Sequence, residues 1–330
     1  MKRTKNIFWI AYFIISFLLF TACDKEISTE AGQDTIGFNI EAITRGSIQN
    51  TDNLPGFGVF AYYHATGGFN EAISTPDYMY NISVQKNASD WVYAPLRYWP
   101  LNGSLSFFAY APHSSETGGA LSLSSETNAG PPILTYTVSD NVAQQFDLLA
   151  ATPVYATTDK SNKVHFEFNH ALSRINFDAK LSSALPSGWT VQVKEIEIGS
   201  FKNKGNYAFD AWVLASDATD KSYAMSVANS LLRNVTVGTT FQPVSADNAN
   251  LFMIPQSVDP GDIIKITLLF NKNGTPEERV FERPLTDIVT HLEEAKAYNV
   301  KITISSPITF DLECQVEDWT TYTITLPPFS

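Results

Sequence analysis

The sequence predicts an all-β protein, and three observations support this. Apolar and polar residues alternate with a period of two along most of the chain, as they do in strands with one buried face. Turn signals such as Asn273-Gly274 separate the alternating stretches. Amphipathic helical patterns do not alternate with the strands, so we expect antiparallel β-sandwiches and not a parallel α/β sheet. Only residues 216–233 and 286–297 offer short helical turns.

The predicted strands follow from this alternation. The stretch from Ile263 through the Asn273-Gly274 turn to Phe281 predicts a β-hairpin. In the last long stretch Cys314 falls on the apolar face, where we expect a small core residue and not a nucleophile. The alternating stretches cover residues 36–42, 57–63, 105–109, 164–168, 175–181, 264–270, 298–304 and 302–316.

Length and phase predict two domains. The 330 residues exceed the size at which a single core stops growing. Inward positions are even-numbered up to Phe168 and odd-numbered from Ile175, which requires a bulge, a bend or a crossing between sheets. The polar segment at 157–162 precedes this break, so we expect β-sandwich domains at 36–162 and 163–330.

The N-terminus predicts export and lipid attachment. Three basic residues precede Phe8–Phe20, an apolar run of thirteen residues, shorter than the roughly 20 that cross a bilayer as a helix. The run ends in Thr21-Ala22-Cys23, which resembles a lipobox, the processing site of bacterial lipoproteins. We expect residues 1–22 to be removed as a signal peptide, Cys23 to carry two or three acyl chains, and 23–35 to form a tether. The alternative is a buried cysteine at the edge of an N-terminal anchor.

Charge and cysteine content restrict the classes of partner. The net charge is −12, and losing three basic signal residues leaves −12 − 3 = −15. Nucleic acid and anionic lipid both require a basic surface, so binding to either by charge is disfavoured. Only one other cysteine follows Cys23, so a packed core and not a disulfide framework must stabilise the fold. The low charged fraction of 17% is typical of an extracellular β-protein.

The sequence offers no catalytic constellation, and we predict no enzyme activity, cofactor or metal. His165 and His170 are an odd number of residues apart, which places them on opposite faces of a strand. Sequence motifs of hydrolases, metalloproteases and phosphate loops are not found. The aromatic cluster from Trp91 to Trp99 could stack on sugars, but in an aromatic-rich β-protein such a cluster more often packs in the core.

Several stretches, taken together in order, resemble the fimbrillin (FimA/Mfa-like) family of Bacteroidetes envelope proteins. The resemblance covers nearly the whole chain that follows the lipobox. The stretches that carry it are 57–62 (FGVFAY), 99–100 (WP), 105–112 (LSFFAYAP), 146–151 (FDLLAA), 164–175 (VHFEFNHALSRI), 253–256 (MIPQ), 297–300 (AYNV) and 316–319 (VEDW).

The resemblance implies two tandem transthyretin-like β-sandwich domains and a pilus subunit that assembles by strand exchange. The subunit is exported as an outer-membrane lipoprotein exposed at the cell surface, and an arginine-specific protease then cuts near its N-terminus. The cut removes the lipidated segment with the first strand, and a strand from another fimbrial subunit fills the vacated groove. A host or bacterial surface ligand is a further implied partner.

Residues of this chain fit each step. The displaced first strand carries Ile36, Phe38, Ile40 and Ala42 on its apolar side, and Arg45 followed by Gly46 is the candidate cleavage site. An ordinary exposed arginine is the alternative interpretation of Arg45. The candidate donor strand alternates at Tyr322, Ile324 and Leu326 before Pro327-Pro328; it could also be simply the last strand of the second domain.

Two functions stay open at this stage. The first is a structural subunit of a pilus in a stalk, tip or anchor role, and an anchor would keep its lipid with Arg45 uncut. The second is a surface-tethered lipoprotein that stays monomeric and binds a glycan or host ligand through the Trp91–Trp99 region. An envelope hydrolase would be a third, but no residue constellation supports it.

Overall fold

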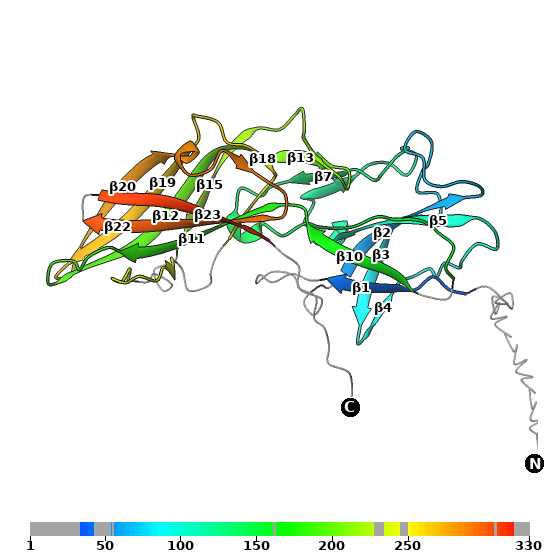
Figure 1. The fold of residues 1–330 in the computed structure, drawn as a ribbon, viewed down its shortest axis with the longest axis horizontal. Helices are drawn as coiled ribbons and strands as arrows, with labels where there is room; N and C mark the ends of the chain where they lie inside the picture. The colour runs from blue at the N-terminus through cyan, green and yellow to red at the C-terminus, as the bar shows by residue number, and fades with distance from the viewer. Residues whose placement is uncertain are drawn as a thin grey trace, which may run out of the picture. The chain divides into compact units, whose positions relative to one another are not determined.

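The predicted all-β class is confirmed. The computed structural model describes residues 34–42, 54, 56–160, 163–227, 234–244, 250–306 and 309–319, all of which belong to one compact unit. Strands dominate this part of the chain (Figure 1), and no helix in it is long and apolar enough to cross a bilayer. Its described helices are short 3-10 turns, η1 (Ser114–Glu116), η2 (Val142–Gln144) and η4 (Leu285–Asp287).

Eight strands of the N-terminal half form the first sheet, which we call sheet A. Its order is β1-β10-β8-β5-β2-β3-β4, with β9 also paired to β5. The first strand β1 pairs parallel with β10, and β10 pairs antiparallel with β8. The strands are β1 (Phe38–Ala42), β2 (Gly56–His64), β3 (Met79–Asn87), β4 (Asp90–Val92), β5 (Ser104–Ala111), β8 (Leu149–Ala151), β9 (Val154–Thr157) and β10 (Val164–His170).

The two ends of sheet A curl toward each other. At the start of β10, Nζ of Lys163 lies 3.2 Å from Oδ1 of Asp90 at the start of β4. The hydroxyl of Tyr93, just after β4, donates to the carbonyl of Ile36, just before β1. The concave face encloses an aromatic core that includes Phe57, Phe107 and Phe166.

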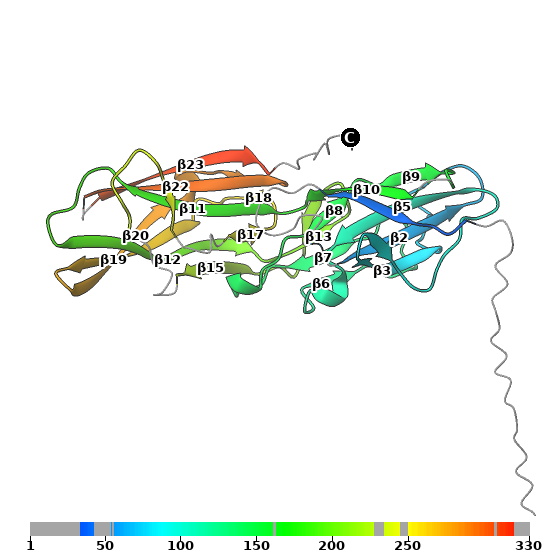
Figure 2. The same ribbon diagram turned by 90° about the horizontal axis from the view of Figure 1, so that it is seen from below.

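Two sheets from the C-terminal half pack as layers (Figure 2) around a shared apolar core. Sheet B has the order β16-β11-β22-β23, with β17 also paired to β11, and sheet C has the order β15-β12-β19-β20. The strands of sheet B are β11 (Ser173–Leu181), β16 (Gln242–Pro243), β17 (Leu251–Met253), β22 (Lys296–Ser306) and β23 (Thr309–Asp318). Those of sheet C are β12 (Trp189–Lys202), β15 (Asp220–Ser226), β19 (Ile263–Lys272) and β20 (Thr275–Pro284).

A fourth sheet, sheet D, combines strands from both halves of the sequence. Its order is β14-β13-β7-β6, and a fifth sheet pairs β18 with β21. A continuous core runs from residues of sheet A through sheet D to sheets B and C. The remaining strands are β6 (Leu121–Leu123), β7 (Leu134–Thr137), β13 (Lys204–Tyr207), β14 (Trp212–Leu214), β18 (Gln256–Ser257) and β21 (His291–Leu292).

The predicted break in phase is a crossing between sheets. In β10 the even-numbered residues from Val164 to His170 are buried, whereas in β11 the odd-numbered residues from Ser173 are buried. The chain passes from sheet A to sheet B through Ala171 and Leu172. Because β10 pairs inside sheet A, we propose that the two sandwiches divide at 171–172 and not at 162–163, with sheet D shared between them.

Three other sequence predictions can be compared directly. The hairpin at Asn273-Gly274 is confirmed as β19 and β20, which pair antiparallel from Lys272 and Thr275 outward. The single strand predicted over 302–316 is wrong, because residues there belong to the antiparallel strands β22 and β23. The sequence between them contains Pro307, which has no N–H to donate to a ladder. The helical turn predicted within 216–233 is also wrong over 220–226, which form β15.

Candidate functional site

The predicted first strand is the most complete candidate site in the described chain. The side chains of Ile36, Phe38 and Ile40 are 1%, 1% and 8% exposed. Alternation predicted this face, since every second residue of a strand points to the same side. Ala42, the fourth residue predicted on this side, is the last residue of β1. The apolar side chains of β1 are therefore part of the hydrophobic core.

Phe38 sits among four other aromatic rings of the N-terminal half. Its ring centroid lies 5.3 Å from Tyr93, 5.7 Å from Phe166, and 6.2 Å from both Phe57 and Phe107. Three of these contacts are edge-to-face or tilted and the Phe166 contact is stacked, in the range of distances at which aromatic pairs attract. The groove that holds β1 is thus shaped for a ring at this position.

Among the described strands, β1 has a sheet neighbour on one side only. It stands at the end of the order of sheet A, paired with β10 from Phe38 opposite Val164 to Ala42 opposite Phe168. Just before β1, the N–H of Ile36 donates to the carbonyl of Arg97 at 2.9 Å. An end strand can leave a sheet by breaking one ladder, whereas a central strand must break two.

The other predicted site residues cannot be placed. Cys23, Arg45, Gly46 and the candidate donor residues Tyr322, Ile324 and Leu326 all lie outside the described residues. Arg45 follows the end of β1 by three residues in the sequence, and the candidate donor strand begins three residues after Trp319, the last described residue.

A buried charged cluster, which sequence reasoning missed, surrounds the crossing from β10 to β11. Nδ1 of His170 lies 2.8 Å from Oδ2 of Asp147, and both side chains are at most 1% exposed. The atoms are close but not aligned as a hydrogen bond. Trp319 stacks on His170 with ring centroids 3.4 Å apart, and the guanidinium of Arg174 lies 4.8 Å from the Trp319 ring. We call Asp147, His170, Arg174 and Trp319 the junction cluster.

Burial dominates the electrostatics of this cluster. It raises the pKa of Asp147, and the neighbouring His170 and Arg174 only partly oppose that rise. The backbone N–H of Trp319 also donates to the carbonyl of Ala295 at 2.8 Å. Trp319, three residues before the candidate donor strand, is therefore held by stacking and by a backbone hydrogen bond.

Two smaller sequence predictions concern histidine and cysteine. His165 is exposed and His170 buried, so their predicted positions on opposite faces of the strand are confirmed. Cys314 is half-buried against the core, and burial raises the pKa of its thiol to about 11. The thiolate is the nucleophilic form, so this environment suits packing and not chemistry.

The predicted aromatic cluster packs largely into the core. Trp99 and Tyr93 are 2% and 9% exposed, and the Trp91 ring lies edge-on to Phe57 at 5.1 Å. The preferred interpretation, core packing, therefore holds for these residues, and the alternative glycan-binding face along Trp91–Trp99 has little aromatic surface available. In contrast, Tyr63, predicted to face inward, is 36% exposed.

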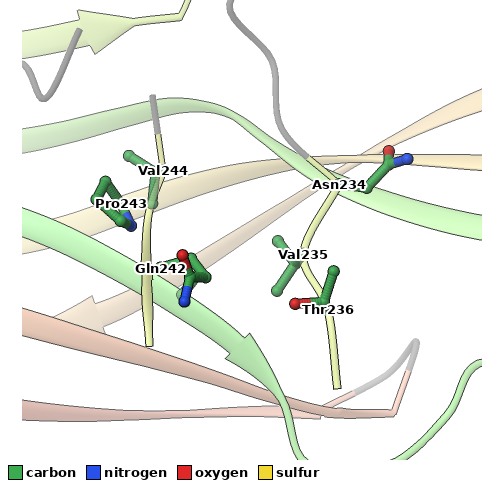
Figure 3. A pocket seen from close by; sticks show the side chains of 7 residues that line it. Asn234, Val235, Thr236, Gln242, Pro243 and Val244 are labelled. Atoms are coloured by element: carbon green, nitrogen blue, oxygen red, sulfur yellow. The ribbon is translucent and has the colours of Figure 1, made fainter. Parts of the chain in front are cut away.

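A separate pocket of about 240 Å³ lies beside β16 and β11 (Figure 3). Residues 234–236 line one side of it and residues 242–244 the other, with Ala179 of β11 completing the lining. None of these seven residues is charged, so the lining itself offers no acid or base.

Comparisons with known proteins agree with the fold. The profile of a family described as fimbrillin-like matches residues 44–319. The chain is 28% identical over 323 residues to the fimbrium subunit Fim1C of Phocaeicola vulgatus, covering 88% of this chain and 84% of that protein. A crystal structure of a fimbrial protein from Bacteroides vulgatus superposes with a TM-score of 0.73 at 23% identity, covering 87% of this chain and all of that one.

Another solved structure, from Bacteroides uniformis, superposes with a TM-score of 0.55 at 18% identity, covering 88% of this chain and 98% of that one. The family match and the relative Fim1C define a class of protein that includes fimbrial subunits. The chain belongs to the fimbrillin-like family, as its sequence resemblance predicted.

Proposed function

We propose that this chain reaches the cell surface as a lipoprotein and enters a fimbrium by proteolysis-triggered strand exchange. Lipid on Cys23 holds the precursor at the outer membrane, and a protease cuts after Arg45. The observation that carries the proposal is the position of β1, a deeply buried strand at the end of a sheet. A cut three residues beyond β1 separates this strand from the rest of the chain.

Loss of β1 would leave two complementary vacancies. The ladder groups of β10 from Val164 to Phe168 would lose their partners, and the groove around Phe166 would lose its apolar filling. An unpaired ladder beside an apolar groove is adhesive, and an added strand satisfies both at once.

The C-terminal segment supplies a strand of matching pattern. Tyr322, Ile324 and Leu326 alternate in the same way as Ile36, Phe38 and Ile40, so three large apolar side chains would face the groove in either case. In the sequence the donor segment starts three residues after Trp319, which stacks on His170. We infer that other fimbrial subunits receive this segment.

A disulfide that fastens β1 to β10 tests the proposal. Asn39 and His165 are register partners with exposed side chains, and neighbouring strands about 4.8 Å apart fall within the Cα separations of disulfides. In a Cys23→Ser background, the Asn39→Cys/His165→Cys variant should be cut by an arginine-specific protease yet remain monomeric on non-reducing gels. Dithiothreitol should then allow ladders to form.

Each single cysteine variant serves as the control and should polymerise after cleavage with or without reductant. Ladders from the oxidised double variant would mean that β1 need not leave, which would overturn strand exchange at this groove. If every variant stayed monomeric with and without reductant, and the protein on cells kept its N-terminus, the tethered binding lipoprotein would be favoured instead.

A further inference from the structure

A surface cleft of about 480 Å³ lies beside the start of β3. Its lining includes Tyr78, Tyr80, Arg97, Asp77 and Glu126. The exposed Tyr63 extends this surface, because its ring centroid lies 6.2 Å from that of Tyr78. The volume is within the range of small-molecule sites, about 300–1,000 Å³.

The aromatic rings of the cleft are held in place by their own hydroxyl groups. Tyr80 donates to the carbonyl of Ser124 at 2.6 Å, and Tyr78 donates to the carbonyl of Tyr98. Both hydroxyls are thus used internally, which fixes the positions of the two rings. Rings fixed before binding lose little conformational entropy when a ligand stacks on them.

The charged groups of the cleft are also braced. Oδ1 of Asp77 accepts a hydrogen bond from the N–H of Tyr63 at 3.1 Å. The loop that carries Arg97 is bonded on either side of Tyr98, since the carbonyl of Arg97 accepts from Ile36 and the N–H of Trp99 donates to Asp34, both at 2.9 Å. Burial raises the pKa of Tyr78, while the charge of Arg97 acts in the opposite direction.

We propose that this cleft binds a neutral saccharide. Sugar rings present apolar C–H faces that pack on aromatic rings, and their hydroxyl groups pair with carboxylates and guanidinium groups. The lining contains two acidic residues and one basic residue, so the local charge disfavours an acidic sugar. The sugar is bound by the uncleaved subunit, in which residues 34–36 hold the loop of Arg97, so the site can be tested without strand exchange.

Saturation-transfer NMR on the uncleaved chain, whose residues 34–36 brace the cleft, tests this assignment. The probes are the methyl glycosides of glucose, mannose, galactose and N-acetylglucosamine, together with lactose and 3′-sialyllactose. At least one neutral probe should give a signal, and Arg97→Gln and Glu126→Gln should each weaken its binding at least tenfold. Adding sialic acid to lactose should not strengthen binding.

Tyr80→Ala should abolish the signal, and the exposed residue Glu126 provides a second variant if Tyr80→Ala fails to fold. The matched control is Tyr155→Ala, which removes a 54% exposed tyrosine that does not line the cleft and should bind as the unmodified chain does. The proposal would be overturned if no neutral probe gave a signal, if binding survived both charge variants, or if the chain preferred 3′-sialyllactose to lactose. None of these results would bear on the disulfide experiment.

Discussion

Truncating Phe38 to alanine should lower the free energy of unfolding of the uncleaved chain by about 3–5 kcal/mol. The ring is 1% exposed and contacts four aromatic side chains, so its removal leaves a cavity that rigid neighbouring strands cannot close. Urea unfolding of the soluble chain from residue 24, followed by tryptophan fluorescence, measures the loss.

Asn39→Ser is the matched control for Phe38. Asn39 is the next residue of β1, points to the opposite face and is exposed, and its side-chain oxygen accepts from the N–H of Ile40. Serine keeps an oxygen there, so the loss should stay within about 0.5 kcal/mol. If Phe38→Ala cost no more than this control, β1 would not be a structural part of sheet A.

Replacing His170 with alanine should cost about 3–5 kcal/mol at pH 7.5, because it leaves the fully buried carboxyl group of Asp147 without its nearest partner. The substitution also removes the ring that stacks on Trp319. His165→Ala on the exposed face of the same strand should cost less than about 1 kcal/mol. A His170→Ala loss as small as that of His165→Ala would show that the cluster does not stabilise the junction.

The loss at His170 should shrink as the pH falls. The pKa of Asp147 is raised in the folded state, so folding takes up a proton and the carboxyl's contribution to stability falls as the pH rises above its ordinary pKa near 4. At pH 5 a larger fraction of Asp147 is uncharged, so removal of the imidazole lowers the free energy of unfolding by less. The double variant Asp147→Asn/His170→Ala should recover part of the loss at pH 7.5, measured by the same urea unfolding.

Alternation predicted several of the strands, among them β1, β10 and β11, each of which buries alternate side chains. It placed Phe38 inward, assigned opposite faces to His165 and His170, and located the β19–β20 hairpin through Asn273-Gly274. It did not single out β12, where a bulge between Val193 and Glu195 shifts the register and interrupts the pattern. The two-residue alternation identifies a strand only where no bulge interrupts it.

Pairing between distant strands could not be read from the sequence. The strand β7 pairs with β13, so sheet D joins segments on either side of the predicted domain boundary. The alternation in β10 would be the same if this strand were the last of the first sandwich or the first of the second. Only its observed pairing with β1 and β8 places it in sheet A.

The junction cluster had a weak signal in the sequence. Asp147 lies within the apolar stretch 146–151, and His170 occupies an inward position of its strand. Each feature marks a buried polar group that needs a partner. The identity of that partner depends on tertiary structure, which brings residues 147 and 170 within 2.8 Å and adds Trp319 from the far end of the chain.

The N-terminal residue of the protein in fimbriae sheared from cells tests the central claim most directly. Sequencing of the polymerised subunit should give Gly46 as the first residue, with the lipid on Cys23 and all of β1 removed. A polymer whose subunits retain a blocked, lipidated Cys23 would contradict the proposal that release of β1 opens the groove for assembly.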